Sequence, residues 1–225
     1  MTDLNFESFK QRVFKCDKCS RLTKFRKLIS QKKRKSYLNQ KYWGKPIVGY
    51  GKLNAQILFI GLAPAAHGAT RTGRVFTGDK SADFLFKCLH KANLCNHPYS
   101  LNKDDGLILY NTYITTALKC VPPEDKPLKK ELDQCFKYFN QEINFLKDLK
   151  VIVALGKIAF DACKYFYKSN YNFNKNIKFE HNKVFKLPNN ILLIGCYHPS
   201  PRNVNTGRIN EKKMVQLFNR VLKLI

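Results

Sequence analysis

The chain has 225 residues, enough for one sizeable hydrophobic core, and no low-complexity stretch divides it, so we expect a single domain over residues 1–225. Its 41 Lys and Arg side chains against 16 Asp and Glu give a formal net charge of +25, far more than solubility needs. This excess predicts a polyanionic partner such as nucleic acid, although a composition rich in Lys and Asn is also typical of an AT-rich genome.

From the N-terminus and the hydropathy we expect neither a secreted nor a membrane-spanning protein. The first residues lack the basic start and apolar core of a secretory signal, and no run reaches the roughly 20 apolar residues of a membrane span. We therefore expect a soluble, intracellular protein of the cytoplasm with no membrane partner. The eight cysteines should be reduced there, so metal binding or burial explains them better than disulfides do.

Hydrophobic periodicity predicts strands that alternate with helices. A short helix over 5–13 leads to the C-x-x-C turn at 16–19, and a basic run over 21–35 is either a solvated face or a phosphate-binding segment. Strands are expected at 56–61, 107–116, 151–155, 184–187 and 191–196, and helices near 81–92, 128–148, 156–167 and 210–225. The alternation predicts a three-layer α/β/α fold around a central, mainly parallel four-stranded sheet.

A glycine-rich loop follows the first of these strands. The sequence GLAPAAH at 61–67 leaves the carboxyl end of an apolar run, and GRVFTGD at 73–79 continues the loop. Ligands bind at that end of the strands in open α/β sheets, and glycine lets the backbone approach a ligand closely. The sequence therefore predicts a pocket here, in which Asp79 is either a pocket carboxylate or the N-cap of the next helix.

Two further segments carry polar groups that we expect at the same edge of the sheet. Asn111 interrupts the apolar side of the second strand, where a buried amide is either a satisfied structural group or one that reads a ligand. The last strand opens into HPSPRN at 198–203.

Four cysteines form two groups. Cys16 and Cys19 share the C-x-x-C turn, whereas Cys120 comes just before a Pro-Pro turn and Cys135 lies in the following helix. Four thiolates can hold a [4Fe-4S] cluster or a tetrahedral zinc ion, and a C-x-x-C turn can also be a redox pair. The other four are expected to pack as small apolar side chains: Cys88, Cys95, Cys163 and Cys196.

Three motifs together resemble the uracil-DNA glycosylase superfamily: GLAPA at 61–65, LYNT at 109–112 and HPSP at 198–201. The continuation RTGR at 71–74 and FTGD at 76–79 is similar to the type 5 (UDGb) branch, whereas type 4 normally has a glutamate where Leu62 stands. The four cysteines match the iron–sulfur branches. The resemblance implies a monofunctional DNA glycosylase that hydrolyses the N-glycosidic bond of uracil or a related damaged base and leaves an abasic site, in base excision repair.

The resemblance also implies roles for single residues. A neutral His198 would donate a hydrogen bond to the uracil oxygen, where negative charge develops as the base departs. Asn111 would match the pairing edge of uracil, and Phe76 would stack on the flipped base. Each has a structural alternative, in which the histidine ties down its loop and the aromatic ring packs in the core.

Ala63 and Ala65 depart from the best-known uracil glycosylases, which have a water-directing carboxylate and a thymine-excluding tyrosine at the matching positions. The resemblance then implies a roomier pocket that suits uracil, 5-hydroxymethyluracil, hypoxanthine and ethenocytosine. It also moves the water-directing role elsewhere, and Asp79 is the candidate.

The remaining expectations concern DNA and partners. The loop of Pro201, Arg202 and Asn203 should enter the DNA, and Ser200 should bind phosphate through its hydroxyl group. We expect a monomer with a structural cluster, and the sequence does not show whether a sliding clamp binds it. Two rival functions are a non-catalytic nucleic-acid-binding protein with a structural four-cysteine metal site and an iron–sulfur redox protein.

Overall fold

A mixed β-sheet forms the centre of the molecule. The computed structural model describes residues 2–225, with side chains from Asn5 onward, and this part of the chain forms a six-stranded sheet in the order β1-β3-β2-β4-β6-β5. The inner strands are parallel: β2 (Ile57–Gly61), β3 (Thr112–Thr116), β4 (Val151–Leu155) and β6 (Leu192–Cys196). The edge strands β1 (Tyr50–Gly51) and β5 (Val184–Lys186) are antiparallel to their neighbours.

The predicted α/β fold with a mainly parallel sheet is confirmed, whereas the number of strands was wrong. The sheet of the described chain has six strands and not four because two short antiparallel strands extend its edges. A strand of two residues such as β1 is too short to produce a detectable hydrophobic alternation.

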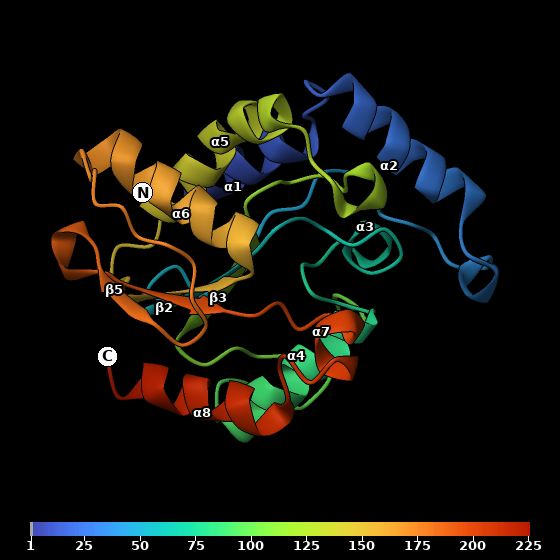
Figure 1. Cartoon of the computed structure of the whole chain (residues 1–225). Helices are drawn as coiled ribbons and strands as arrows, with labels where there is room; N and C mark the ends of the chain where they lie inside the picture. Colours follow the sequence, from blue (N-terminus) through green and yellow to red (C-terminus); the bar gives the residue numbers. More distant parts are fainter. Residues whose placement is uncertain (1) are drawn as a thin grey trace.

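Helices cover both faces of the sheet and give three layers (Figure 1). One face carries α4 (Lys80–Lys91) and α8 (Glu211–Leu222), and the other carries α5 (Lys129–Asn144) and α6 (Lys157–Tyr171), with α1 (Thr2–Phe14) beside α5. Strand β2 shows the alternation that produces this arrangement. Ile57 and Phe59 pack into the core on the α4–α8 side, and Leu58 and Ile60 pack into the core under α5 and α6. No helix within residues 2–225 is long and apolar enough to cross a membrane.

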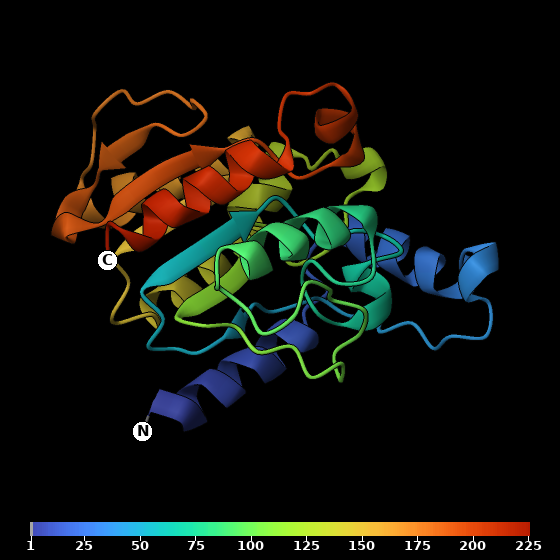
Figure 2. The ribbon, with the colours of Figure 1, turned by 90° about the horizontal axis from the view of Figure 1, so that it is seen from below.

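The basic run that the sequence left without a structure forms a projecting segment. Helix α2 (Ser20–Lys32) and the 3-10 turn η1 (Lys35–Tyr37) extend beyond the sheet layers (Figures 1 and 2). We call residues 20–41 the arm. The other short elements are α3 (Ala69–Thr72), η2 (Pro123–Asp125), η3 (Pro188–Asn190) and α7 (Pro201–Asn205).

Strand β3 is shorter than predicted, and its start matters for the site. The sequence predicts a strand over 107–116, but the strand begins at Thr112. The preceding Asn111 has φ 48°, in the left-handed region, which ends the extended backbone.

Candidate active site

A cavity of about 310 Å³ lies at the carboxyl ends of the parallel strands. Its size is that of an ordinary small-molecule site. Its walls come mainly from the loops that follow β2 and β6, as the sequence predicts. The lining residues are Leu62, Ala63, Ala65, Phe76, Asp79, Ser81, Asp125, His198, Ser200 and Pro201.

The first wall is the loop after β2, which the end of β3 holds in place. The carbonyl oxygens of Gly61 and Leu62 accept hydrogen bonds from the amides of Ala117 and Leu118, at 3.0 and 2.9 Å. A Cβ atom on Gly61 would lie 2.8 Å from the Phe76 ring, so only glycine lets the ring pack over the strand end. Phe76 is buried and has φ 47°, a costly backbone conformation for a bulky residue.

His198 lies beside Phe76 in the lining of the cavity. Its ring centroid lies 5.9 Å from that of Phe76, with the ring planes inclined by 33°. Burial lowers the pKa of His198 to about 4, so the imidazole is neutral at physiological pH. The loop behind it is held by Asn203, whose side-chain amide donates to the His198 carbonyl oxygen at 2.9 Å. The ring itself accepts or donates no hydrogen bond within residues 5–225. It is therefore a neutral donor available to a ligand.

Asp79 fits both of its predicted readings. Its Oδ1 accepts hydrogen bonds from the amides of Ser81 and Ala82, both at 3.0 Å, which caps helix α4. Its Oδ2 faces Gly68, where an added Cβ would lie only 2.0 Å away. Burial raises the pKa of Asp79 above its usual value, against the effect of the two capping amides. The carboxylate thus uses one oxygen for structure and lines the cavity as well.

Asn111 lies at the other end of the sheet, so its predicted role in reading the base was wrong. Its side chain exchanges two hydrogen bonds with Gln56, one to the Gln56 amide and one to the Gln56 side chain, each 2.8 Å long. The pairing of Ile57 with Thr112 places this contact at the amino ends of β2 and β3. The structural alternative holds, because both ends of the amide are satisfied far from the cavity. The β3 residue at the cavity end is Thr116.

The loop after β6 is partly engaged in its own structure. The Ser200 hydroxyl accepts the amide of Asn203 at 3.4 Å and caps α7. Pro201 lines the cavity, whereas Arg202 is exposed on α7 outside it. Because Asn203 binds the His198 carbonyl, it positions the loop. The predicted DNA contacts of Ser200, Pro201, Arg202 and Asn203 stay predictions.

Two important residues were not assigned a role from the sequence. Asp125, on η2 after the Pro-Pro turn, adds a second carboxylate to the cavity. Arg71 lies buried beneath the glycine-rich loop, where it donates to the carbonyl oxygens of His67 at 2.7 Å and Gly78 at 2.8 Å. Asp125 could have been found from its place in the segment that leaves the carboxyl end of β3. Arg71 could have been found as an arginine within a glycine-rich loop.

The four predicted metal ligands line one small cavity, separate from the first. Cys16 and Cys19 come from the turn between α1 and α2, and Cys120 and Cys135 come from the segment after β3 and from α5. Burial, and after it the neighbouring Cys135, raises the pKa of Cys120 to about 12. The Lys119 amide donates to the Cys135 sulfur at 3.3 Å. Across residues 5–225, however, no three His, Cys, Asp or Glu side chains are close enough together to hold a single metal ion.

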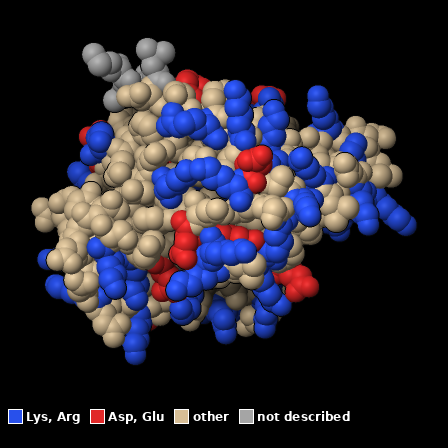
Figure 3. Space-filling view, turned by 90° about the horizontal axis from the view of Figure 1, so that it is seen from above, with Lys and Arg blue, Asp and Glu red and all other residues tan. Residues whose placement is uncertain are grey.

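The surface around these sites is basic. Figure 3 shows Lys and Arg side chains spread over the face formed by α1, α2 and α5, with Asp and Glu in smaller groups. A polyanion would meet a favourable potential here.

Comparisons with known proteins agree with the geometry. The family model of the Uracil DNA glycosylase superfamily matches residues 48–223. A type-5 uracil-DNA glycosylase of Pyrobaculum aerophilum is 37% identical over 215 residues, which cover 96% of this chain and 91% of that protein. A type-5 uracil-DNA glycosylase of Thermus thermophilus is 38% identical over 219 residues, 97% of each chain. A type-4 uracil-DNA glycosylase of Pyrobaculum aerophilum is only 26% identical over 160 residues, 71% of this chain and 64% of that protein.

Proposed function

This chain belongs to the uracil-DNA glycosylase superfamily, and we propose that it hydrolyses the N-glycosidic bond of uracil and related damaged bases in DNA. The product is an abasic site, which base excision repair then processes. The single observation that carries the proposal is the meeting of a neutral, half-buried His198, the Phe76 ring and the Asp79 carboxylate in one cavity. A metal-stabilised binding protein or a redox protein would not need this combination.

The cavity residues supply what the reaction needs. A base must leave the duplex before its bond to the sugar can be reached, and an aromatic ring such as Phe76 stabilises the extruded base by stacking. Negative charge then builds on the departing base. His198 donates a hydrogen bond to that charge from a site where water is largely displaced, so the bond is stronger than it would be in solution.

The attacking water is oriented by Asp79. Its Oδ2 has no hydrogen-bond partner within residues 5–225, while its Oδ1 is held by the helix N-terminus. A carboxylate that is fixed on one side can accept a proton from water on the other. Asp125 lies on the same cavity but is exposed, and no helix N-terminus holds its carboxylate in place for this step.

The substrate range is broad. Ala63 and Ala65 contribute only methyl groups to the cavity wall, which leaves room for ring substituents. We therefore include 5-hydroxymethyluracil, hypoxanthine and ethenocytosine, in addition to uracil, among the proposed substrates. We also propose that the enzyme acts as a monomer.

A [4Fe-4S] cluster bound by Cys16, Cys19, Cys120 and Cys135 completes the proposal. Four thiols of the right type line one cavity, and burial raises the pKa of Cys19, Cys120 and Cys135. A zinc ion would bind all four thiolates itself, whereas in a cluster each cysteine binds a different iron. We propose the cluster because these four cysteines match the iron–sulfur branches of the superfamily. The cluster would fix the position of the η2 segment that carries Asp125.

The test of the activity is release of the free base. The intact chain is incubated with duplexes that hold U, hydroxymethyluracil, hypoxanthine or ethenocytosine opposite a normal base, and with an undamaged duplex. We expect free base and alkali-labile abasic sites from the damaged duplexes, without strand breaks before alkali. Absence of free base from every damaged duplex would contradict the proposal.

The test of the cluster is separate from activity. We expect the purified protein to be brown and to contain about four irons and four sulfides per chain. Cys120→Ala should lose iron and colour, whereas the control Cys163→Ala, at a buried cysteine in α6, should keep both. A colourless intact protein that contains one zinc ion would overturn the assignment.

A further inference from the structure

The arm carries an unusual concentration of unpaired positive charge. No Asp or Glu occurs between Lys18 and Gly78, a stretch that includes the whole arm. The arm has six exposed basic residues: Lys24, Lys27, Lys32, Arg34, Lys35 and Lys41. Within residues 5–225 the ion pair that involves the arm is Arg21 with Glu131, and none of these six takes part in one. Their charges are therefore available to a partner.

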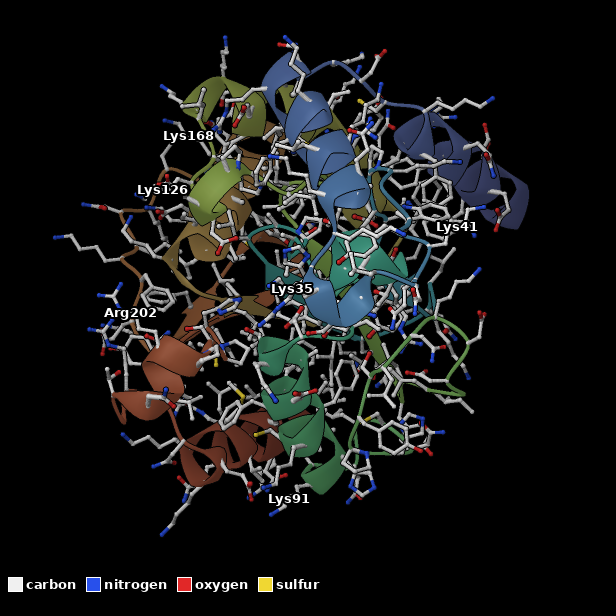
Figure 4. All side chains as sticks on the ribbon, turned by 90° about the vertical axis from the view of Figure 1, so that its right-hand side faces the viewer. Lys35, Lys41, Lys91, Lys126, Lys168 and Arg202 are labelled. Carbon is white, nitrogen blue, oxygen red and sulfur yellow. The ribbon has the colours of Figure 1, made fainter. Side chains whose placement is uncertain are left out.

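The end of the arm lies on the same face as the active-site cavity. Figure 4 views this face, with Lys35 near its centre and Arg202 and Lys126 to one side. Arg202 follows the cavity residue Pro201, and Lys126 follows the cavity residue Asp125. Basic side chains thus lie on the same face of the molecule as the cavity.

The arm is tied firmly to the active-site loop. The Arg71 guanidinium stacks 3.9 Å from the ring centroid of Tyr37 and donates to the Gln40 side chain at 2.7 Å. The same guanidinium holds the carbonyl oxygen of Gly78, next to Asp79. At the base of the arm, the Tyr42 hydroxyl lies 3.0 Å from Nδ1 of His67. These contacts fix the position of the arm relative to the cavity.

We propose that the arm binds the phosphates of duplex DNA on one side of the extruded nucleotide. This proposal rests on the proposed function, because that function places a flipped base in the cavity and a duplex across its mouth. Duplex DNA presents one phosphate charge per roughly 1.7 Å of its axis, whereas α2, with its 13 residues, is about 20 Å long. The arm can therefore reach several phosphates beyond those that α7 meets.

The test compares two variants: one in which four basic residues of the arm are replaced, and one in which four basic residues near the amino ends of the parallel strands are replaced. The arm variant is Lys32→Gln, Arg34→Gln, Lys35→Gln and Lys41→Gln. The matched control is Lys52→Gln, Lys147→Gln, Lys150→Gln and Lys186→Gln, all exposed and near the amino ends of the parallel strands. Both variants lose the same net charge. Binding to an undamaged duplex is measured by fluorescence anisotropy from 50 to 200 mM salt, and uracil release is measured in parallel.

We expect the plot of log Kd against log salt to become shallower by about 2 or more for the arm variant and to change by less than about 0.5 for the control. Because each phosphate contact contributes a factor of about eight at 0.1 M salt, Kd at that salt should rise by about 10²-fold for the arm variant. Shortening a uracil duplex on one side only should weaken binding by the intact chain and leave the arm variant unaffected.

Equal salt slopes for the arm variant and the control would overturn the proposal. If the quadruple arm variant does not fold, the single variants Lys32→Gln and Lys35→Gln decide, and each should lower the slope by about 0.9. Failure of the proposed function gives a different result. In that case neither the intact chain nor the control variant releases uracil, whereas binding to the undamaged duplex still measures the contribution of the arm.

Discussion

The amino ends and the carboxyl ends of the parallel strands, which we call the amino edge and the carboxyl edge of the sheet, hold polar residues in opposite ways. At the amino edge, Asn111 and Gln56 satisfy each other through two hydrogen bonds. At the carboxyl edge, the His198 ring and Oδ2 of Asp79 have no partners within residues 5–225, and Phe76 holds a costly backbone conformation. A paired amide therefore supports the fold, whereas half-buried polar groups that the fold leaves unpaired are available to a substrate.

The sharpest test of this comparison is His198→Ala. Removing a donor that stabilises developing charge slows such reactions by about 10²–10³-fold, so we expect a loss of that size in the single-turnover rate of uracil release. Thermal unfolding should change little, because the ring makes no hydrogen bond within the described side chains. A rate within tenfold of the intact chain would contradict the assigned role.

The second test separates the two carboxylates of the cavity. Asp79→Asn can still cap α4 through its side-chain oxygen, so stability should hold while the single-turnover rate falls by about 10²-fold. Asp125→Asn should lower the rate by less than tenfold, because that carboxylate is exposed. The reverse order would assign the water to Asp125, and no effect from Asp79→Asn would leave it as a cap alone.

The pH dependence gives an intermediate effect. Burial lowers the pKa of His198 to about 4, so its imidazole is neutral at physiological pH, and burial raises the pKa of Asp79 above its usual value. As the pH falls, the imidazole gains a proton near pH 4, and the Asp79 carboxylate loses its charge at a higher pH than an ordinary aspartate does. We expect a single-turnover rate with no step near pH 6.5 from an ordinary histidine and with a decline in the acidic range. In Asp79→Asn the remaining decline should reflect His198 alone, near pH 4.

The smallest effect on catalysis is expected at the amino edge. Asn111→Ala should leave the rate of uracil release and the preference for uracil within about twofold. It should lower the free energy of unfolding by about 1–3 kcal/mol in urea titrations, because Gln56 loses its partner and alanine tolerates the left-handed backbone poorly. A large loss of activity in a folded variant would return Asn111 to the site.

The sequence predicts the carboxyl-edge site well because its motifs follow strands of strong hydrophobic character. Ala63, Ala65, Phe76, Asp79, His198, Ser200 and Pro201 all line the cavity. Such motifs lie on loops that begin where β2 and β6 end, so the direction of the parallel strands fixes the edge at which they meet.

The sequence fails where a boundary or a distant contact decides. Asn111 reads as part of a strand because Leu107 to Thr116 is rich in β-forming residues, and only its φ of 48° places it before the strand. The arm reads as a mere charge run because its packing depends on Arg71, which lies 30 or more residues away from its partners Tyr37 and Gln40. Asp125 has no local pattern, since the turn that carries it is short and irregular.

Gly61 gives the site a property that no lining side chain supplies. The Phe76 ring rests against the Gly61 backbone, which has no side chain. The position of this backbone therefore determines how deep the cavity is for an incoming base. One methyl group at this position would push the Phe76 ring into the cavity, so a base larger than uracil would be excluded before uracil itself. A backbone atom without a side chain therefore sets the size of the base that the cavity can hold.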